Sequence, residues 1–367
     1  MNPGRWWAML RHYALPRMDV PLAVALLLLI GVSLVNLHSA GGGNTQLVIA
    51  QGLRFAVGFA GMWVVSRIPP RQLRQWTPYF FIIALLLLAL VPFFGTGRSG
   101  RHWLNLGVVY FQPGELMKLA VPMVVAGYLH ARVLPPQWKD LFWSALLIAA
   151  PTALILIQPD LGTALLVGVS GAAVLFLAGM AWWRIGLIAA LGLACAPIGW
   201  LFLRDYHRDR LRTFLDPEAD PLGAGWNIIQ AKIAVGSGGL SGKGWGHGTQ
   251  SRLEFLPEHT TDFILAVFAE EFGWVGIVLL LALCLFIVGR CLWIAANARD
   301  TWSRLMAGTI GLAFSVYVLA NAGMVSGLLP VMGIPMPLMS YGGTSAVTLL
   351  LGFGLVMSIH AHRKFMA

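Results

Sequence analysis

The residue that stands out chemically is Asp262, a carboxylate at the boundary between a polar stretch and the apolar run FILAVFA. An acid at such a boundary either caps a helix or belongs to a site, and Thr260 and Thr261 already offer caps there. Glu270 and Glu271 follow on the same segment and point to different sides of a helix. We expect one of them to meet a neighbouring helix or cavity, and the other to lie nearer water or pair with a base.

Two further places hold residues that could bind a ligand. Glu115 and Lys118, in FQPGELMKLAVP, are three residues apart and can therefore pair on one helix face. The spacing is compatible both with a structural ion pair and with a cavity for a charged or sugar-bearing ligand. Asp160, in QPDLGT, stands where a turn leads into a helix, and this position favours a capping role.

Other motifs that carry chemistry elsewhere are weak here. The stretch GSGGLSGKGWGHG has seven glycines, but Ser237 occupies the first glycine position of a phosphate-binding loop and Gly244 replaces its Ser or Thr. The three cysteines have no paired spacing, and His360 and His362 point to different faces of a helix. The sequence therefore predicts neither a nucleotide site nor a metal site, and tight turns explain the glycines.

The composition defines the environment in which these residues act. Of the 367 residues, 58% are hydrophobic and 11% are charged, against about 25% charged in soluble domains. The net charge of +10 comes with 15 Trp and 19 Phe, which is typical of a membrane protein with aromatic residues at the interfaces rather than of a nucleic-acid partner. We expect an all-α integral membrane protein that forms one domain over residues 1–367.

Membrane spans are predicted from apolar runs of about 20 residues. Ten such runs can be counted, at 20–38, 46–66, 77–94, 113–131, 141–158, 161–180, 184–203, 262–289, 304–326 and 342–362. Basic residues then orient the bundle, because short cytoplasmic loops are enriched in Lys and Arg. With both termini inside, the inner segments hold fourteen basic residues and the short outer loops hold only two, Arg98 and Arg101. We therefore expect cytoplasmic termini.

The long segment 204–261, between the seventh and eighth predicted spans, is then outside the membrane. It is too polar to span, and Trp226, Ile229 and Ile233 have the spacing of a short amphipathic helix lying at the outer interface. Near the other end of the chain, MVSGLLPVMGIPMPLMSYGG contains three prolines and cannot form a regular helix. Irregular backbone at membrane depth is tolerated where it lines a cavity or is buried in protein.

Several of these segments together resemble the SEDS family of membrane proteins (shape, elongation, division and sporulation). The resemblance is carried by RHWLNLG, FQPGELMKLAVP, QPDLGTA, NAGMVSGLLPVMGIPMPLMSYGG and the stretch from LDPEADPLGAGWN to LEFLPEHTTDF. It covers nearly the whole chain and is strongest for the elongation branch. It implies a ten-span fold with a long extracytoplasmic loop, and a glycosyltransferase that polymerises lipid II outside the cytoplasmic membrane during rod-shaped growth.

The family's functional residues map onto this sequence with two departures. Its essential Asp falls on Asp262, its important Trp and Glu fall on Trp103 and Glu115, and Lys118 and Asp160 match further family positions. Gly114 stands where the family usually has Ser. His259 is shifted by one position from the family's usual histidine, so a role for that histidine is not carried over.

The implied chemistry agrees with the residues present. Converting an α-linked phosphate into a β-linked glycoside requires inversion by single displacement, for which one general base suffices, and Asp262 is the candidate. The pyrophosphate leaving group needs charge neutralisation, for which the candidates are Lys118, Arg204, Arg208 and Arg210. No cofactor is required, although Mg²⁺ could bridge the substrate phosphates.

The resemblance also implies partners and leaves alternatives. Partners are the lipid II substrate, a class B penicillin-binding protein acting as transpeptidase, other membrane proteins of the elongation complex and membrane lipid, with no nucleic acid. One alternative is a lipid II flippase, because ten spans with buried charges suit a transporter too. The candidate residues map to the outer face alone, which favours the polymerase. The division branch of the family, with the same chemistry, is the other alternative.

Overall fold

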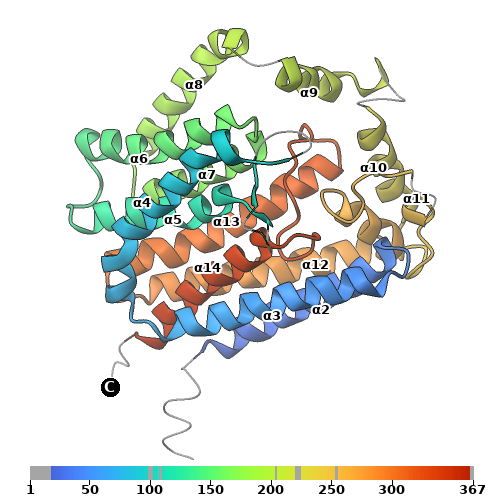
Figure 1. The fold of residues 1–367 in the computed structure, drawn as a ribbon, viewed down its shortest axis with the longest axis horizontal. Helices are drawn as coiled ribbons and strands as arrows, with labels where there is room; N and C mark the ends of the chain where they lie inside the picture. Colours follow the sequence, from blue (N-terminus) through green and yellow to red (C-terminus); the bar gives the residue numbers. More distant parts are fainter. Residues whose placement is uncertain are drawn as a thin grey trace, which may run out of the picture.

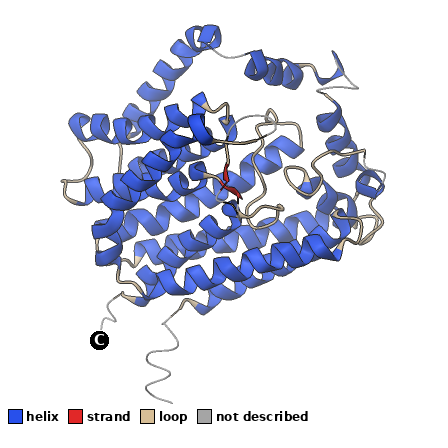
Figure 2. Cartoon of the chain, in the orientation of Figure 1, coloured by secondary structure: helices blue, strands red, loops and turns tan. Residues whose placement is uncertain are grey.

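The protein is an almost entirely helical bundle (Figure 1). The computed structural model describes residues 18–97, 102–105, 107, 110–202, 205–219, 225–252 and 255–363. The only strands in these residues are β1 (Leu104–Asn105) and β2 (Tyr110–Phe111), an antiparallel pair in the connection between α4 and α5 (Figure 2). The long helices are α2 (Val20–Ala40), α3 (Thr45–Arg67), α4 (Pro70–Phe94), α5 (Pro113–His130), α6 (Trp138–Ile157), α7 (Leu161–Leu177), α8 (Trp182–Phe202), α12 (Ile264–Ala296), α13 (Thr301–Val325) and α14 (Thr344–Ala361).

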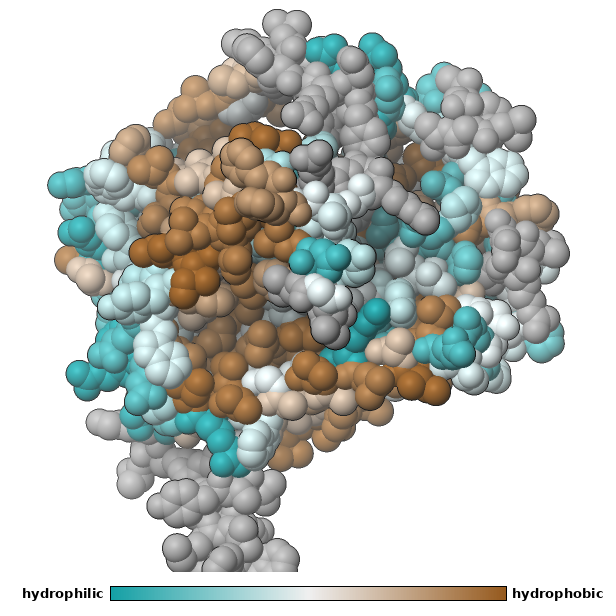
Figure 3. Space-filling model, in the orientation of Figure 1, coloured by the Kyte–Doolittle hydropathy of each residue, from teal (hydrophilic) through white to brown (hydrophobic). Residues whose placement is uncertain are grey.

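Every segment predicted as a span is helical. Seven of these helices are long and apolar enough to cross a membrane, namely α2, α3, α4, α6, α12, α13 and α14. The helix α5 carries Glu115 and Lys118 within its 18 residues, and α7 is 17 residues long. Apolar side chains such as Leu86 of α4 and Leu279 of α12 lie on the outside of the bundle, and Figure 3 shows how much of one face is hydrophobic. The protein is therefore an integral membrane protein, while ten crossings remain a prediction.

The core of the bundle is built around α12, α13, α14 and α5. The large side chains Trp302, Phe314 and Phe353 are almost completely buried there, and the rings of Phe314 and Phe353 meet edge to face at 5.6 Å. The helix α14 packs along α3 with little space between the two main chains. A Cβ atom at Gly354 would lie 2.9 Å from the carbonyl oxygen of Met62, so this close approach requires glycine.

Ion pairs join several helix ends at one end of the bundle. Arg290 of α12 donates to both carboxylate oxygens of Asp19, which caps α2. Arg74 of α4 lies 3.5 Å from Asp300, which caps α13. We call this the basic end, and it comprises the termini that carry Arg67, Arg74, Arg132, Arg184, Arg290 and Arg363. The helix α2 begins at this end, and Asn36, near its other end, donates to the carbonyl of Ile264, so the start of α12 lies toward the opposite end of the bundle.

The helix α12 is interrupted at Gly273, whose φ of 64° is left-handed. The glycine-rich stretch lies against this interruption and replaces the missing helical hydrogen bonds. The N–H groups of Lys243 and Gly244 donate to the carbonyls of Glu270 and Glu271, both at 3.0 Å. In the other direction, the N–H groups of Trp274 and Val275 donate to the carbonyls of Gly239 and Leu240, at 2.9 and 3.1 Å. The glycines thus allow one main chain to dock on another.

The polar segment after α8 contains short helices. They are α9 (Asp205–Leu215), the 3₁₀ turn η1 (Pro217–Ala219), α10 (Trp226–Ser237) and α11 (Thr249–Arg252). The helix α10 packs on α12 through Ile228, Ala231 and Ala234, which are buried, whereas Ile233 is 45% exposed. The side of α10 that packs on α12 is thus different from the apolar side that carries Trp226, Ile229 and Ile233. The small side chains of Ala231 and Ala234 allow α10 to lie close to α12. A search for the spacing of large apolar residues does not detect such a face.

Candidate active site

Asp262 lies in a turn just before α12, not in the first turn of the helix. The helix begins at Ile264, and its N-cap residue is Phe263, which makes no side-chain cap. The carboxylate of Asp262 lies instead beside the proline-rich segment, which is not helical between Val325 and Thr344. A Cβ atom at Gly333, whose φ is +72°, would lie 3.6 Å from Asp262 Oδ2. Asp262 therefore lies in an irregular part of the chain and does not cap a helix.

The charges around Asp262 make it an unusually basic carboxylate. Its pKa is raised from 3.8 to about 6, first by burial and second by the nearby carboxylate of Glu258. Arg210 of α9 acts in the opposite direction, and the carboxylate of Asp160 adds a further increase. Residues far apart in the sequence are therefore within electrostatic reach of one another, as expected for a site that tunes a base.

Asp160 performs the capping role that its position in the sequence favours, and it also belongs to this region. Its Oδ1 accepts from the N–H of Thr163 at 3.0 Å, at the start of α7, and its Oδ2 accepts from Gln112 at 2.8 Å. Two residues further along, a Cβ atom at Gly162 would lie 2.6 Å from the carbonyl oxygen of Met332. The turn that holds Asp160 is thus packed against the proline-rich segment that also flanks Asp262.

Glu115 and Lys118 form the ion pair that their spacing predicts. Lys118 Nζ lies 2.7 Å from Glu115 Oε1, and both side chains are more than 90% buried. They line a cavity of about 30 Å³ together with Tyr317, whose ring centre is 5.5 Å from Lys118 Nζ, and Thr309. Among the described residues, Glu115 Oε2 and Thr309 Oγ1 have no hydrogen-bond partner. The pair therefore borders a small cavity whose remaining lining is mostly apolar.

The remaining predicted site residues are Trp103 and the arginines of the segment after α8. Arg208 and Arg210 lie on α9, and Arg210 is the one that acts on Asp262. Trp103 is half-buried and bridges to Thr96 in the connection that leads into α5. Arg204 lies outside the described residues. No group of three His, Cys, Asp or Glu side chains in the described part of the chain could hold a metal ion.

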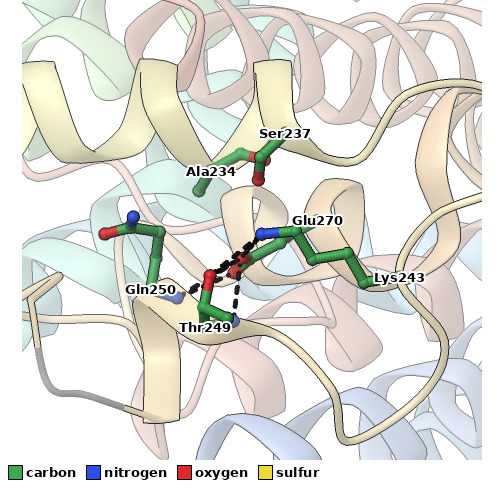
Figure 4. A network of polar contacts seen from close by, with 6 residues as sticks. All are labelled: Ala234, Ser237, Lys243, Thr249, Gln250 and Glu270. Atoms are coloured by element: carbon green, nitrogen blue, oxygen red, sulfur yellow. Dashed lines mark hydrogen bonds and ion pairs between the residues drawn. The ribbon is translucent and has the colours of Figure 1, made fainter.

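Both acidic residues deeper in α12 are buried, and as expected one meets a neighbouring helix while the other pairs with a base. Glu270 pairs with Lys243 at 2.6 Å and accepts from the hydroxyl and the N–H of Thr249, both at 2.8 Å (Figure 4). Glu271 accepts from Ser39 of α2. The two carboxylates thus hold the glycine-rich stretch on α12. The sequence did not predict which base pairs with Glu270, because the dense glycines around Lys243 gave no sign of their docking partner.

Two amides that sequence reasoning missed, the half-buried Gln112 and the buried Asn321, join the parts of this site. Gln112, which precedes α5, reaches Asp160, and Asn321 of α13 reaches the main chain of Asp262. Neither amide is part of a recognisable motif of charges, so a search for titratable residues does not find them. A polar side chain inside an apolar helix, as Asn321 is, would have been the available signal.

The arrangement defines a class of protein: a helical membrane protein with a basic carboxylate, neighbouring cations and a buried ion pair at the end of the bundle opposite the basic end. Residues 14–365 match the model of the FtsW, RodA and SpoVE family, described as cell cycle proteins. The chain belongs to this family.

Individual relatives agree over the full length of the chain. The peptidoglycan glycosyltransferase MrdB of Escherichia coli (strain K12) is 50% identical over 352 residues, which are 95% of each chain. A chain of a peptidoglycan synthase complex, studied for its structural coordination of polymerization and crosslinking, superposes with a TM-score of 0.83 at 32% identity, covering 95% of this chain and 98% of that one. The crystal structure of the rod shape determining protein RodA of Thermus thermophilus has a TM-score of 0.72 at 29% identity with the same coverage.

Proposed function

We propose that this protein is a peptidoglycan glycosyltransferase that polymerises lipid II into glycan strands at the outer face of the cytoplasmic membrane during cell elongation. One observation carries the proposal: Asp262 is a half-buried, unusually basic carboxylate in a chain that is 50% identical to MrdB over nearly its whole length. The likeness supports the substrate class, and the carboxylate supports the reaction type.

In the proposed reaction Asp262 is the general base. It accepts the proton of the 4-hydroxyl of the acceptor's N-acetylglucosamine as that oxygen attacks C1 of the donor's N-acetylmuramic acid. The bond from C1 to the pyrophosphate breaks in the same displacement, and undecaprenyl pyrophosphate leaves with the bonding electrons. A pKa of about 6 keeps Asp262 ionised at neutral pH and yet more basic than a hydrated carboxylate.

Pyrophosphate requires neutralisation of its charge rather than protonation when it leaves. Lys118 and Arg210 are proposed to supply positive charge, with Arg208 and Arg204 on the same connection between α8 and α10. Trp103, Glu115 and Asp160 are proposed to shape the substrate site. Mg²⁺, if it takes part, would be held by the substrate phosphates, because the described carboxylates form no metal cluster.

The proposed orientation places the basic end in the cytoplasm. Short cytoplasmic loops of membrane proteins are rich in Lys and Arg, and this end carries most of the basic helix termini. Asp262, at the opposite end, would then face the periplasm, where lipid II presents its sugars. The solved relative belongs to a complex of polymerisation and crosslinking. We therefore propose a class B penicillin-binding protein as partner, along with other elongation proteins and membrane lipid.

A direct assay tests the proposed activity. The purified full-length protein, with and without its transpeptidase, is supplied with lipid II, and the glycan product is separated by length. Polymer that increases with the transpeptidase present supports the proposal. Transbilayer movement of lipid II in vesicles without any polymer would favour a flippase instead.

The raised pKa of Asp262 predicts the acid limb of the pH profile. A general base works only when ionised, so kcat/KM, which reports the pKa of the free enzyme, should fall about tenfold per pH unit below about pH 6. Replacing Glu258 with Gln removes a neighbouring negative charge, so we expect the limb to move to lower pH. Replacing Arg210 with Gln removes a positive charge and should move the limb to higher pH. If the acid limb does not move in either variant, or moves in the same direction in both, Asp262 is not the group that titrates as the general base.

A further inference from the structure

The main-chain carbonyl groups of Thr260, Thr261 and Asp262 are all bound by α13 or by the segment between α13 and α14. The N–H of Tyr341 donates to the carbonyl of Thr260 at 2.9 Å. The hydroxyl of Ser340 donates to the carbonyl of Thr261 at 2.6 Å. Asn321 Nδ2 donates to the carbonyl of Asp262 itself at 2.8 Å. We call Asn321, Ser340 and the N–H of Tyr341 the carbonyl clamp.

The clamp also determines the shape of the proline-rich segment. The same Nδ2 of Asn321 donates to the carbonyl of Ile334 at 2.7 Å, next to Gly333. Ser340 accepts from the N–H of Met336 at 2.8 Å. Leu338 lies between Met336 and Ser340 in the sequence and is buried with a φ of 58°. A residue with a branched side chain adopts this conformation only when its surroundings hold it there. One set of hydrogen bonds therefore holds both Asp262 and the segment beside its carboxylate.

A turn needs such support because helical hydrogen bonds do not fix it. Asp262 precedes the first residue of α12, so nothing in the helix restrains the direction of its side chain. The groups that face its carboxylate come from separate elements: Glu258 from its own turn, Arg210 from α9 and Asp160 from the start of α7. A rotation of the turn would change the distances from the Asp262 carboxylate to these charged groups and would carry the carboxylate toward water.

We propose that Asn321 and Ser340 are positioning residues for the glycosyl transfer, which hold the Asp262 carboxylate against Gly333 in the geometry that proton abstraction requires. The inference rests on the proposed function. Asn321 is fully buried and Ser340 nearly so, and both act through main-chain atoms, so they need not touch the substrate. Misplacement of a reacting group by 1 Å costs about 10²-fold in rate, which sets the scale of the effect.

The test uses the full-length protein with its transpeptidase, lipid II as substrate, and the variants Asn321→Leu and Ser340→Ala. Leu has nearly the shape of Asn but donates no hydrogen bond. We expect kcat to fall by about 10- to 100-fold with KM nearly unchanged. We also expect the acid limb of the kcat/KM profile to move to lower pH, because a released carboxylate is better hydrated and titrates nearer its ordinary pKa.

Two further variants separate positioning from stability. Ser340→Thr keeps the hydroxyl and should restore kcat and the acid limb. Ser358→Ala is the matched control, because Ser358 is also buried and also donates to a main-chain carbonyl, that of Ile68, but at the basic end. It should leave both quantities unchanged. If Asn321→Leu accumulates poorly, the comparison of Ser340→Ala with Ser340→Thr provides the test.

Several results would overturn the inference. One is a normal kcat and acid limb in Asn321→Leu and Ser340→Ala. Another is an equal loss in Ser340→Ala, Ser340→Thr and Ser358→Ala that follows the melting temperature. Failure of the proposed function is recognised separately, because the unsubstituted protein with its transpeptidase would then make no polymer from lipid II. An inactive Asp262→Asn beside fully active clamp variants would reject the clamp alone.

Discussion

Replacing Asp262 with Asn is expected to abolish glycan polymerisation, lowering the rate by at least about 10²-fold, the lower range of general-base contributions. Asparagine keeps the shape of the side chain but cannot take the proton of the attacking hydroxyl. Folding should survive, because the main chain of Asp262 is held through its carbonyl by Asn321 and the side chain caps no helix. The measurement is glycan product from the purified complex with its transpeptidase, given lipid II.

Two other substitutions make this result specific. Asp262→Glu should recover little activity, because one more methylene group moves the base by about 1 Å beside Gly333. Asp216→Asn is the matched control, since Asp216 is an exposed acid in the segment that follows α9 and is not part of the site. It should polymerise normally. Substantial polymer from Asp262→Asn would remove Asp262 from the role of base.

Breaking the buried pair of Glu115 and Lys118 should have the second largest effect, on stability. The charge left behind by Glu115→Gln or Lys118→Met would be unpaired among buried groups, and such losses typically cost about 3–5 kcal/mol. The double variant should lose much less than the sum of the two single variants, because it leaves no unpaired charge. Thermal unfolding of the purified protein in detergent measures each member of this cycle.

An exposed pair in the same chain provides the comparison. Arg212 and Asp209 of α9 are also three residues apart, at 3.4 Å, but their side chains are 68% and 63% exposed. The same cycle on this pair should give a coupling of about 1 kcal/mol or less, since water screens it. Additive effects at Glu115 and Lys118, no larger than those on α9, would show that the buried pair is not a coupled unit.

The sequence alone determined the elements and the chemical inventory of this protein. Apolar runs of about 20 residues carry their own signal, because lipid demands an apolar surface along the whole length of a helix. All ten predicted runs are helices, and the segment with Pro330, Pro335 and Pro337 is irregular as expected. The spacing of Glu115 and Lys118 likewise predicted their pairing, since neighbours on one helix need no tertiary information.

The tertiary structure alone decided how distant segments meet. The docking of the glycine-rich stretch on the interrupted α12 depends on main-chain hydrogen bonds, which leave almost no trace in the side-chain pattern. In the carbonyl clamp, Asn321 and Ser340 bind a turn about 60 to 80 residues away. The acceptors are main-chain carbonyls, which every residue type has, so the sequence gives no sign of these contacts. Asp262 could thus be found from its chemistry at an apolar boundary, but its surroundings could not. They depend on which distant side chains reach the main chain and the carboxylate of Asp262, and the sequence does not show which distant segments meet.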